Sequence, residues 1–213
     1  MSRPAATSPA SLPNAAWPGR PMNRACLRWP RETDTMKRLA AFLFASALLL
    51  HAGPLAGKRV ASFTLPDSQG RYHDVLDYRG KILLIDIMRT DCPHCGTFSR
   101  TLERVKSRYG DRIHILSIVN PPDNQQTVAA YVAKHKITTP VLFDFGQAVA
   151  AMLNITPQNP TIKLPTLLIV GPDGIIREDL VHDESRKDLK NIFEGDGLNR
   201  ILDKLLAESG GKK

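Results

Sequence analysis

Residues 81–98, KILLIDIMRTDCPHCGTF, decide the fold of this 213-residue chain. The first half, KILLIDIM, is a nearly continuous apolar run, which is typical of a strand buried on both faces of a sheet. After this stretch, apolar residues recur at helical spacing up to Gly110, and glycine is common at helix C-termini. The sequence therefore predicts a buried strand followed directly by a helix, with Cys92 and Cys95 at the junction.

Similar patterns continue on both sides of this unit. Upstream, two short strands are expected around a turn signal at 67–70. Downstream, strand-like and helix-like segments follow in the order RIHILSIVN (112–120), NQQTVAAYVAKHK (124–136), TPVLFD (139–144), GQAVAAMLN (146–154), LPTLLIV (164–170) and the turn GPDGII (171–176). A last helix is expected to start near Glu184 or Ser185, with an interruption at 195–197. This order predicts one α/β domain with a mixed central β-sheet flanked by helices and an N-terminal β-hairpin extension.

The N-terminal part reads as a leader. Residues 1–35 are rich in Pro, Ala, Ser and Arg without an apolar period, which predicts a disordered segment and a start-site artefact ahead of Met36. Residues 36–57 combine a positive start, an apolar run of about a dozen residues and small residues after it, as in a secretory signal peptide. An uncleaved membrane anchor is the alternative. The folded domain is expected at 58–213, in the periplasm or an otherwise exported compartment.

The net charge of +8 comes mostly from this leader. Residues 1–57 hold 7 of the 29 Lys and Arg residues but only 2 of the 21 Asp and Glu residues. The predicted domain therefore carries a net charge of only +3. Because it also lacks a basic motif with interleaved aromatic residues, we expect no nucleic-acid partner.

Cys92 and Cys95 are the candidates for the chemistry, because the third cysteine, Cys26, lies in the leader. Structural zinc usually takes four ligands, so one cysteine pair predicts no metal site. Covalent haem attachment needs His directly after the second Cys, and Gly96 stands there. A static disulfide is the remaining alternative, but so small a loop adds little stability. The spacing at a strand-to-helix junction favours reversible thiol–disulfide exchange.

The expected position of Cys92 at a helix start favours its thiolate. Unpaired backbone N–H groups and the helix dipole stabilise negative charge there, which lowers the pKa of the thiol and makes Cys92 the predicted nucleophile. Pro93 suits the first helical turn. Cys95 lies one turn further on and is the predicted resolving thiol. His94 can add positive charge or a hydrogen bond to the thiolate; an exposed polar residue without a role is the alternative.

The pair CPHC, taken with FTLPDSQG (63–70), LDYRGKILLIDI (76–87) and LPTLLIVGPDGII (164–176), resembles the thioredoxin-like superfamily. Within it, the chain resembles the secreted TlpA/ResA-type, AhpC/TSA-related thiol–disulfide oxidoreductases. The resemblance implies that Pro165 is a cis-proline facing the Cys pair, that Leu164 offers backbone groups to a substrate segment, and that Thr166 begins the strand. It also implies protein thiols and disulfides as partners, a membrane redox donor or acceptor, and no cofactor. A trans proline at the strand start is the alternative.

Asp86 lies within the predicted central strand, six residues before Cys92. Strand alternation places it on the face of Leu84 and Met88, which predicts a core-facing carboxyl group. A buried carboxylate without a partner is costly and has a raised pKa. An acid there resembles the buried acid of thioredoxins, which relays protons to and from the resolving Cys. An outward-facing Asp86 is the alternative.

Three features depart from the TlpA pattern. Asp91 stands where Trp usually precedes the first Cys, and its carboxylate opposes a thiolate unless it is solvated or caps the helix. The Pro-His spacer is that of the oxidant DsbA, and His94 predicts a more oxidising disulfide. The segment TPQNPTIK (156–163) is longer than the usual lead-in to the proline, and it either shapes partner choice or is a tolerated insertion. The direction of electron flow stays open.

Two other functions remain as alternatives. A peroxiredoxin-like peroxidase has a similar sequence ahead of its reactive Cys. Its chemistry requires Thr or Ser three residues before that Cys and Pro four residues before the Thr or Ser, but this chain has Arg89 and Ile85 at these positions. A copper-binding or redox-sensing module usually spaces its cysteines three residues apart and adds a distant histidine. His182 is available for that role, although the cysteine spacing differs.

Overall fold

The computed structural model describes residues 53–210. The leader at 1–35 with Cys26, and residues 36–52 of the expected signal sequence, lie outside the described residues. Within residues 53–210, no helix is long and apolar enough to cross a membrane.

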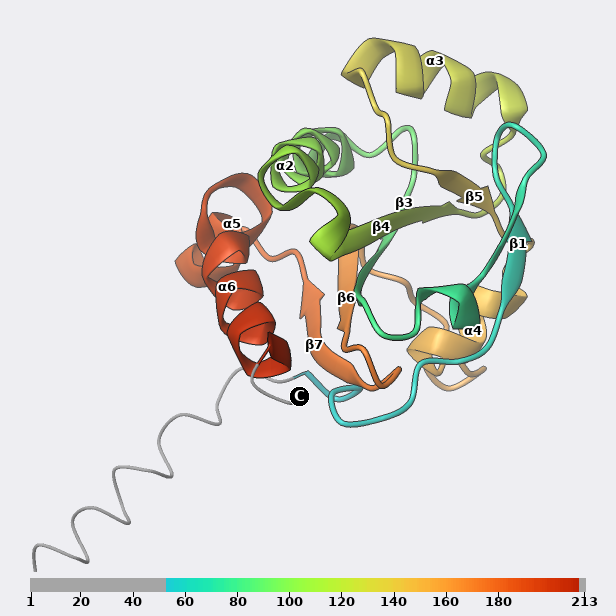
Figure 1. Ribbon diagram of the computed structural model, residues 1–213. Helices are drawn as coiled ribbons and strands as arrows, with labels where there is room; N and C mark the ends of the chain where they lie inside the picture. Colours follow the sequence, from blue (N-terminus) through green and yellow to red (C-terminus); the bar gives the residue numbers. More distant parts are fainter. Residues whose placement is uncertain (1–52, 211–213) are drawn as a thin grey trace, which may run out of the picture. The chain divides into compact units, whose positions relative to one another are not determined.

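A five-stranded mixed sheet forms the centre of the described part (Figure 1). Its strand order is β5-β4-β3-β6-β7. The strands are β3 (Ile82–Met88), β4 (Ile113–Val119), β5 (Val141–Phe143), β6 (Thr166–Val170) and β7 (Ile176–Val181). β3 pairs parallel with β4 and antiparallel with β6, so it is the central strand that its apolar run predicts. All seven of its residues are buried.

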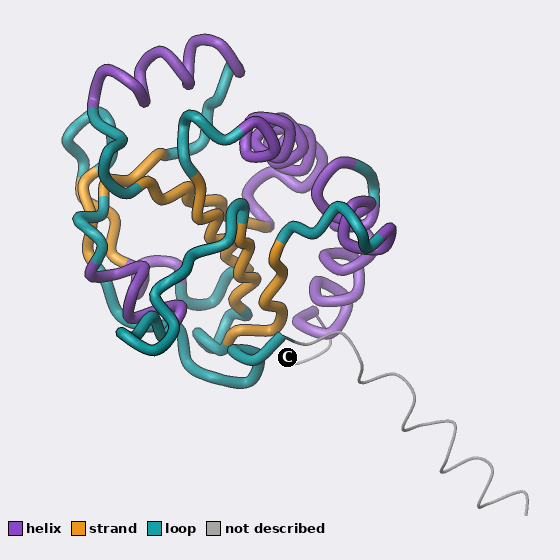
Figure 2. The backbone as a smooth tube through the Cα atoms, turned by 180° about the vertical axis from the view of Figure 1, so that it is seen from behind, coloured by secondary structure: helices purple, strands orange, loops and turns teal. Residues whose placement is uncertain are grey.

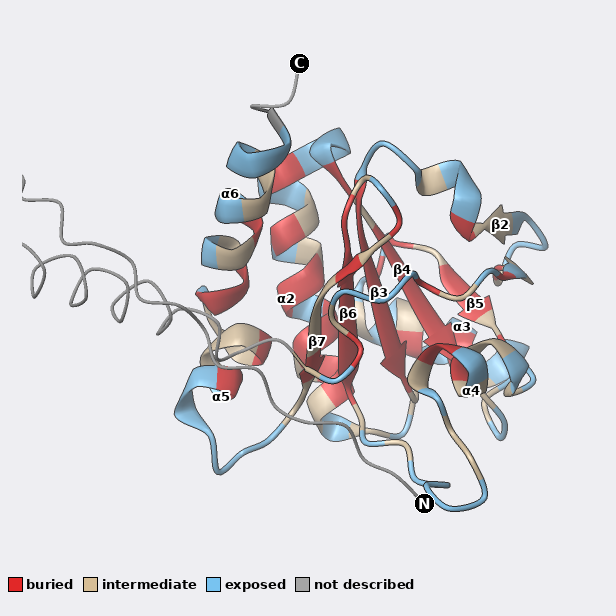
Figure 3. Ribbon diagram, turned by 90° about the horizontal axis from the view of Figure 1, so that it is seen from below, coloured by how far each residue is buried: buried red, intermediate tan, exposed pale blue. Residues whose placement is uncertain are grey.

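Helices cover both faces of the sheet, as the sequence predicts. They are α2 (Pro93–Tyr109), α3 (Gln125–His135), α4 (Gln147–Leu153), α5 (Lys187–Glu194) and α6 (Gly197–Gly210), with 3₁₀ turns η2 (Val75–Tyr78) and η3 (Gly110–Arg112). Side chains of β3 alternate between two core clusters: Ile82 and Leu84 pack with α2, α5 and α6, whereas Leu83 and Ile85 pack with α4. Figure 2 shows the second face, and Figure 3 shows buried residues concentrated along the sheet and on the inner sides of the helices.

The N-terminal hairpin is also confirmed, as β1 (Thr64–Pro66) and β2 (Tyr72–Asp74). Its turn is held by Asp67, whose buried carboxylate accepts hydrogen bonds from the backbone N–H groups of Gln69 and Arg71 and also meets His73 Nε2 at 3.0 Å. These partners hold the pKa of the Asp67 carboxyl well below its usual range, although burial alone would raise it.

The segment 57–68 reaches both edges of the sheet. Gly57 donates its backbone N–H to Ile176 at the start of β7, and Lys58 accepts a hydrogen bond from the Ile176 N–H. At the opposite edge, Ser68 donates its backbone N–H to Val141 of β5, and Asp67 forms a bridge to Leu142. One stretch of chain therefore contacts both outermost strands.

The C-terminal helical segment, which α5 and α6 form, begins later than the sequence predicts. Its expected start is near Glu184 or Ser185, but α5 begins at Lys187. The Asp183 carboxylate accepts hydrogen bonds from both the backbone N–H and the hydroxyl of Ser185, which closes a turn instead of a first helical turn. The predicted interruption is confirmed, because α5 ends at Glu194 and α6 starts at Gly197.

Candidate active site

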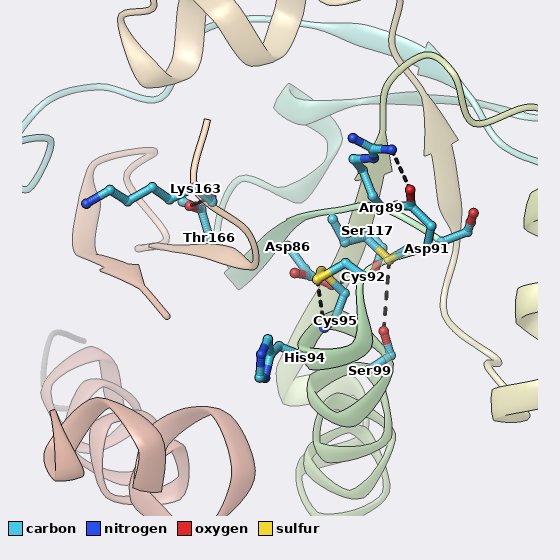
Figure 4. Close-up of a disulfide and its surroundings, with 12 residues drawn as sticks. Asp86, Arg89, Asp91, Cys92, His94, Cys95, Ser99, Ser117, Lys163 and Thr166 are labelled. Carbon is cyan, nitrogen blue, oxygen red and sulfur yellow. Dashed lines mark hydrogen bonds and ion pairs between the residues drawn. A yellow bond between two sulfur atoms is a disulfide. The ribbon is translucent and has the colours of Figure 1, made fainter. Parts of the chain in front are cut away.

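The two cysteines lie at the N-terminus of α2, which follows the central strand β3 after a short turn. Cys92 is the N-cap residue of α2, Pro93 is the first helical residue, and Cys92 Sγ accepts a hydrogen bond of 3.2 Å from the backbone N–H of Cys95. The two residues form a disulfide with a Cα–Cα distance of 5.2 Å, as Figure 4 shows. Cys92 is half-buried, whereas Cys95 has no exposed surface. Only one sulfur of the pair is therefore open to another molecule.

The carboxylate that precedes Cys92 has a partner that the sequence analysis missed. Arg89 Nη2 lies 2.5 Å from Asp91 Oδ2, and both side chains are exposed. The guanidinium offsets the negative charge of Asp91 next to Cys92 (Figure 4). Strand alternation gave no signal for this pair, because Thr90 and Asp91 lie in a turn that the hydrogen bond from the Cys92 N–H to the Arg89 carbonyl oxygen closes.

Asp86 is fully buried, as strand alternation predicts, and it lies on the face of the sheet that α2 covers. Its Oδ2 accepts a hydrogen bond of 3.3 Å from Ser117 Oγ on β4, and Oδ1 has no partner among the described residues. Burial raises the pKa of Asp86 to about 7, and the Ser117 hydrogen bond offsets this only in part. Figure 4 draws Asp86 alongside the Cys pair. A carboxyl group with this pKa can both hold and release a proton at neutral pH.

The loop before β6 supplies the opposite side of the site. The Leu164–Pro165 peptide bond is cis, the isomer that the resemblance implies. Leu164 packs against the small apolar cluster that includes Met88, Cys92 and Cys95. Thr166 pairs with Ile87 of β3, and its hydroxyl donates a hydrogen bond of 2.6 Å to the Lys163 carbonyl oxygen. The residues predicted for substrate binding therefore lie beside the cysteines.

His94 has a set of neighbours that sequence reasoning did not find. Its ring is stacked on that of His182, with centroids 4.5 Å apart and an angle of 26° between the planes. Its Nε2 lies 3.2 Å from Glu184 Oε1. His182 directly follows β7 and its side chain is 5% exposed, while Glu194 Oε1 at the end of α5 lies 3.9 Å from its Nε2. Burial and the nearby His94 hold the pKa of His182 below its usual value, although Glu194 acts in the opposite direction.

The segment that leads from β3 to Cys92 is held by Asp123, which lies just before the N-cap of α3. The backbone N–H of Thr90 donates a hydrogen bond of 3.1 Å to Asp123, and the Thr90 hydroxyl donates to the same carboxylate. Asp123 also accepts from Thr127 Oγ1 in the first turn of α3. These contacts fix the approach of the chain to the cysteines.

The chain matches known proteins in sequence and in fold. The model of the AhpC/TSA family matches residues 56–179. The thiol-disulfide oxidoreductase ResA of Halalkalibacterium halodurans is 25% identical over 121 residues, which are 57% of this chain and 65% of that protein. The thioredoxin-like protein YneN of Bacillus subtilis is 21% identical over 142 residues, which are 66% of this chain and 79% of that protein.

A solved structure shows the same fold. The thioredoxin domain of a thiol-disulfide oxidoreductase from Bacteroides vulgatus superimposes with a TM-score of 0.58 at 17% identity, and the match covers 72% of this chain and 99% of that domain. At this identity the likeness concerns the fold alone. The predicted thioredoxin-like fold and the AhpC/TSA-related resemblance are thereby confirmed.

Proposed function

This chain belongs to the AhpC/TSA family and shares its fold with thiol-disulfide oxidoreductases, and we propose that it is an exported enzyme which exchanges disulfides with partner proteins through Cys92 and Cys95. The observation that carries the proposal is the asymmetry of the pair: Cys92 is a half-exposed helix N-cap, and Cys95 is fully buried one turn further on. A partner sulfur can approach the first cysteine, and only an internal reaction can involve the second.

In the reducing direction, the Cys92 thiolate attacks a sulfur of a partner disulfide. A mixed disulfide forms between Cys92 and that sulfur, and the other partner sulfur leaves as a thiolate. The helix N-terminus supports the Cys92 thiolate before attack, and the Cys95 N–H at 3.2 Å from Sγ is one of its donors. The loop of Leu164, Pro165 and Thr166 is the proposed contact for the partner backbone.

The second step releases the partner. Asp86, as a carboxylate, accepts the proton of the Cys95 thiol, and the resulting Cys95 thiolate attacks Cys92 Sγ. The mixed disulfide breaks, the Cys92–Cys95 disulfide forms, and the partner leaves with both sulfurs reduced. In the oxidising direction the same steps run backwards, and Asp86 returns the proton to Cys95. The pKa of Asp86, raised to about 7 by burial, suits this exchange at neutral pH.

We expect a disulfide that is more oxidising than that of thioredoxin, whose potential is about −270 mV. His94 in the spacer and the pairing of Asp91 with Arg89 both favour a stabilised thiolate in the reduced form. The proposal includes a membrane redox donor or acceptor that resets the enzyme in the periplasm. The expected signal sequence at 36–57 supports export.

The test compares the full chain with its Cys92→Ser variant. Wild type should reduce or oxidise a protein disulfide substrate, Cys92→Ser should have no activity, and equilibration with glutathione buffers should give the reduction potential. Exchange by Cys92→Ser at the wild-type rate would refute the proposal. Rapid consumption of hydrogen peroxide without protein disulfide exchange would instead favour the peroxiredoxin-like alternative. Copper binding that needs both thiols, again without exchange, would favour the copper module.

A further inference from the structure

We propose that His94, His182 and Glu194 form a binding site for a divalent transition-metal ion of the zinc class at the mouth of the active site. The proposed site uses no cysteine. It therefore remains when Cys92 and Cys95 form their disulfide, and it does not depend on the proposed exchange activity. It also differs from a copper module, whose ligands would be the two thiols.

Three separate elements bring the ligands together. His94 comes from the first turn of α2, His182 from the end of β7 and Glu194 from the last residue of α5. One ligand atom from each lies within 4.8 Å of the others. Within residues 53–210, this is the one group of three or more His, Cys, Asp or Glu side chains that converge so closely. Two imidazoles and a carboxylate are a common protein ligand set for zinc.

The buried nitrogen of His182 is the second observation that points to a ligand. The His182 side chain is 5% exposed, and its Nε2 has no hydrogen-bond partner among the described residues. A buried polar atom without a partner costs free energy, on the order of 1–3 kcal/mol. Nε2 faces Glu194 Oε1 at 3.9 Å, too far for a hydrogen bond. A metal ion between these two atoms would satisfy both.

One carboxylate oxygen of Glu194 pairs with a lysine, and the other faces the proposed metal ligands. Lys190, one turn earlier on α5, has its ammonium group 3.9 Å from Glu194 Oε2. The other oxygen, Oε1, is the one that faces His182. Lys190 thus pairs with the far side of the carboxylate and does not stand between the proposed ligands.

Metal binding requires a small movement of the His94 side chain. Ligand atoms in a tetrahedral zinc site lie about 3.4 Å apart, given bonds of about 2.0–2.1 Å, so the present spacing of up to 4.8 Å must shorten. The stacked His94 ring must also turn to bring its lone pair toward the ion. Its side chain is 42% exposed, which leaves room for this rotation. The fourth position would hold water, or the Glu184 carboxylate that now faces His94 at 3.2 Å.

An ion at this place would act on the neighbouring chemistry. His94 belongs to the spacer between the two cysteines, so a metal bound to it lies beside the sulfur that a partner must reach. The ion would also occupy the imidazole that the proposed mechanism uses to support the Cys92 thiolate.

The test measures zinc binding to the oxidised full chain by isothermal titration calorimetry, after alkylation of the Cys26 thiol. Closing the disulfide removes Cys92 and Cys95 as ligands. We expect saturable binding of one Zn²⁺ ion, and a loss of affinity of at least about tenfold in His182→Gln, since removal of even an outer-shell partner often has an effect of this size. Glu194→Gln should weaken binding in the same way, and it provides a second, less buried position if His182→Gln fails to fold.

Matched controls replace the same residue types outside the cluster. His135→Gln on α3 and Glu208→Gln on α6 should bind Zn²⁺ with wild-type affinity. Absence of saturable binding to the oxidised wild type would overturn the proposal, as would unchanged affinity in both His182→Gln and Glu194→Gln. Disulfide exchange by the metal-free wild type is measured separately, so loss of the metal proposal leaves the proposed activity unaffected.

Discussion

Replacing the buried Asp86 with asparagine should make protein stability less dependent on pH. Burial raises the pKa of Asp86 from 3.8 to about 7 in the folded protein. Because the folded state then holds the proton more tightly than the unfolded chain does, the stabilisation is fully present below the unfolded pKa and is lost as the pH rises to the folded pKa. The asparagine variant has no such titration.

The size of the effect follows from the pKa shift. Raising the pKa of Asp86 from 3.8 to about 7 corresponds to on the order of 4 kcal/mol of stability over the whole pH range, of which about 2–3 kcal/mol falls between pH 5 and pH 8. Wild type should therefore lose about this much stability relative to Asp86→Asn between the two pH values. Comparison of the two proteins cancels the titration of groups that they share.

Urea unfolding of the oxidised proteins at pH 5 and pH 8 measures this difference, because the closed disulfide keeps Cys92 and Cys95 from titrating. Asp111→Asn is the matched control. Asp111 is exposed, so its replacement should change the pH dependence by less than about 0.5 kcal/mol. A difference between Asp86→Asn and wild type that is equal at both pH values, within about 0.5 kcal/mol, would refute the reasoning.

Three further changes test other parts of the site and the fold. Cys95→Ser should accumulate a stable mixed disulfide at Cys92 with a substrate protein, visible on non-reducing gels, and rapid release of the partner would contradict the resolving role. Arg89→Gln should leave Asp91 without its partner and make the disulfide less oxidising, by no more than the roughly 1 kcal/mol of an exposed ion pair; an unchanged potential in glutathione buffers would contradict this. Tyr109→Phe should cost about 0.5–1.5 kcal/mol in urea unfolding, because its hydroxyl bonds to α6 at 2.8 and 3.0 Å, and unaltered stability would show that these bonds contribute nothing.

Local patterns were sufficient for most of the fold. The apolar run of β3 predicted a central strand, and its alternation predicted that Asp86 faces the core rather than solvent. Gly110 ends α2 with a positive φ of 55°, which few other residues adopt without strain. The start of α5 was missed because the Asp183–Ser185 turn competes with the helix, and such competition depends on side-chain geometry that periodicity does not contain.

The candidate site was predictable only where it lies along one stretch of chain. The cysteines and His94 are adjacent in sequence, and Pro165 was implied by the resemblance. His182 and Glu194 come from elements that meet α2 only after the sheet and the C-terminal helices have packed. Nothing in the sequence around His182 or Glu194 indicates that they lie near His94, so only the three-dimensional structure reveals this cluster.

The contacts of the segment 57–68 with β5 and β7 have a consequence for self-association. Outermost strands expose unpaired backbone groups, which can template the addition of strands from other chains. Here the chain itself occupies part of both edges before another molecule can do so. Removal of this segment would expose backbone groups of both outermost strands and would also take the buried side chains of Val60 and Phe63 out of the core. By covering part of both edges, this segment leaves fewer backbone groups on β5 and β7 open to pairing with a second molecule.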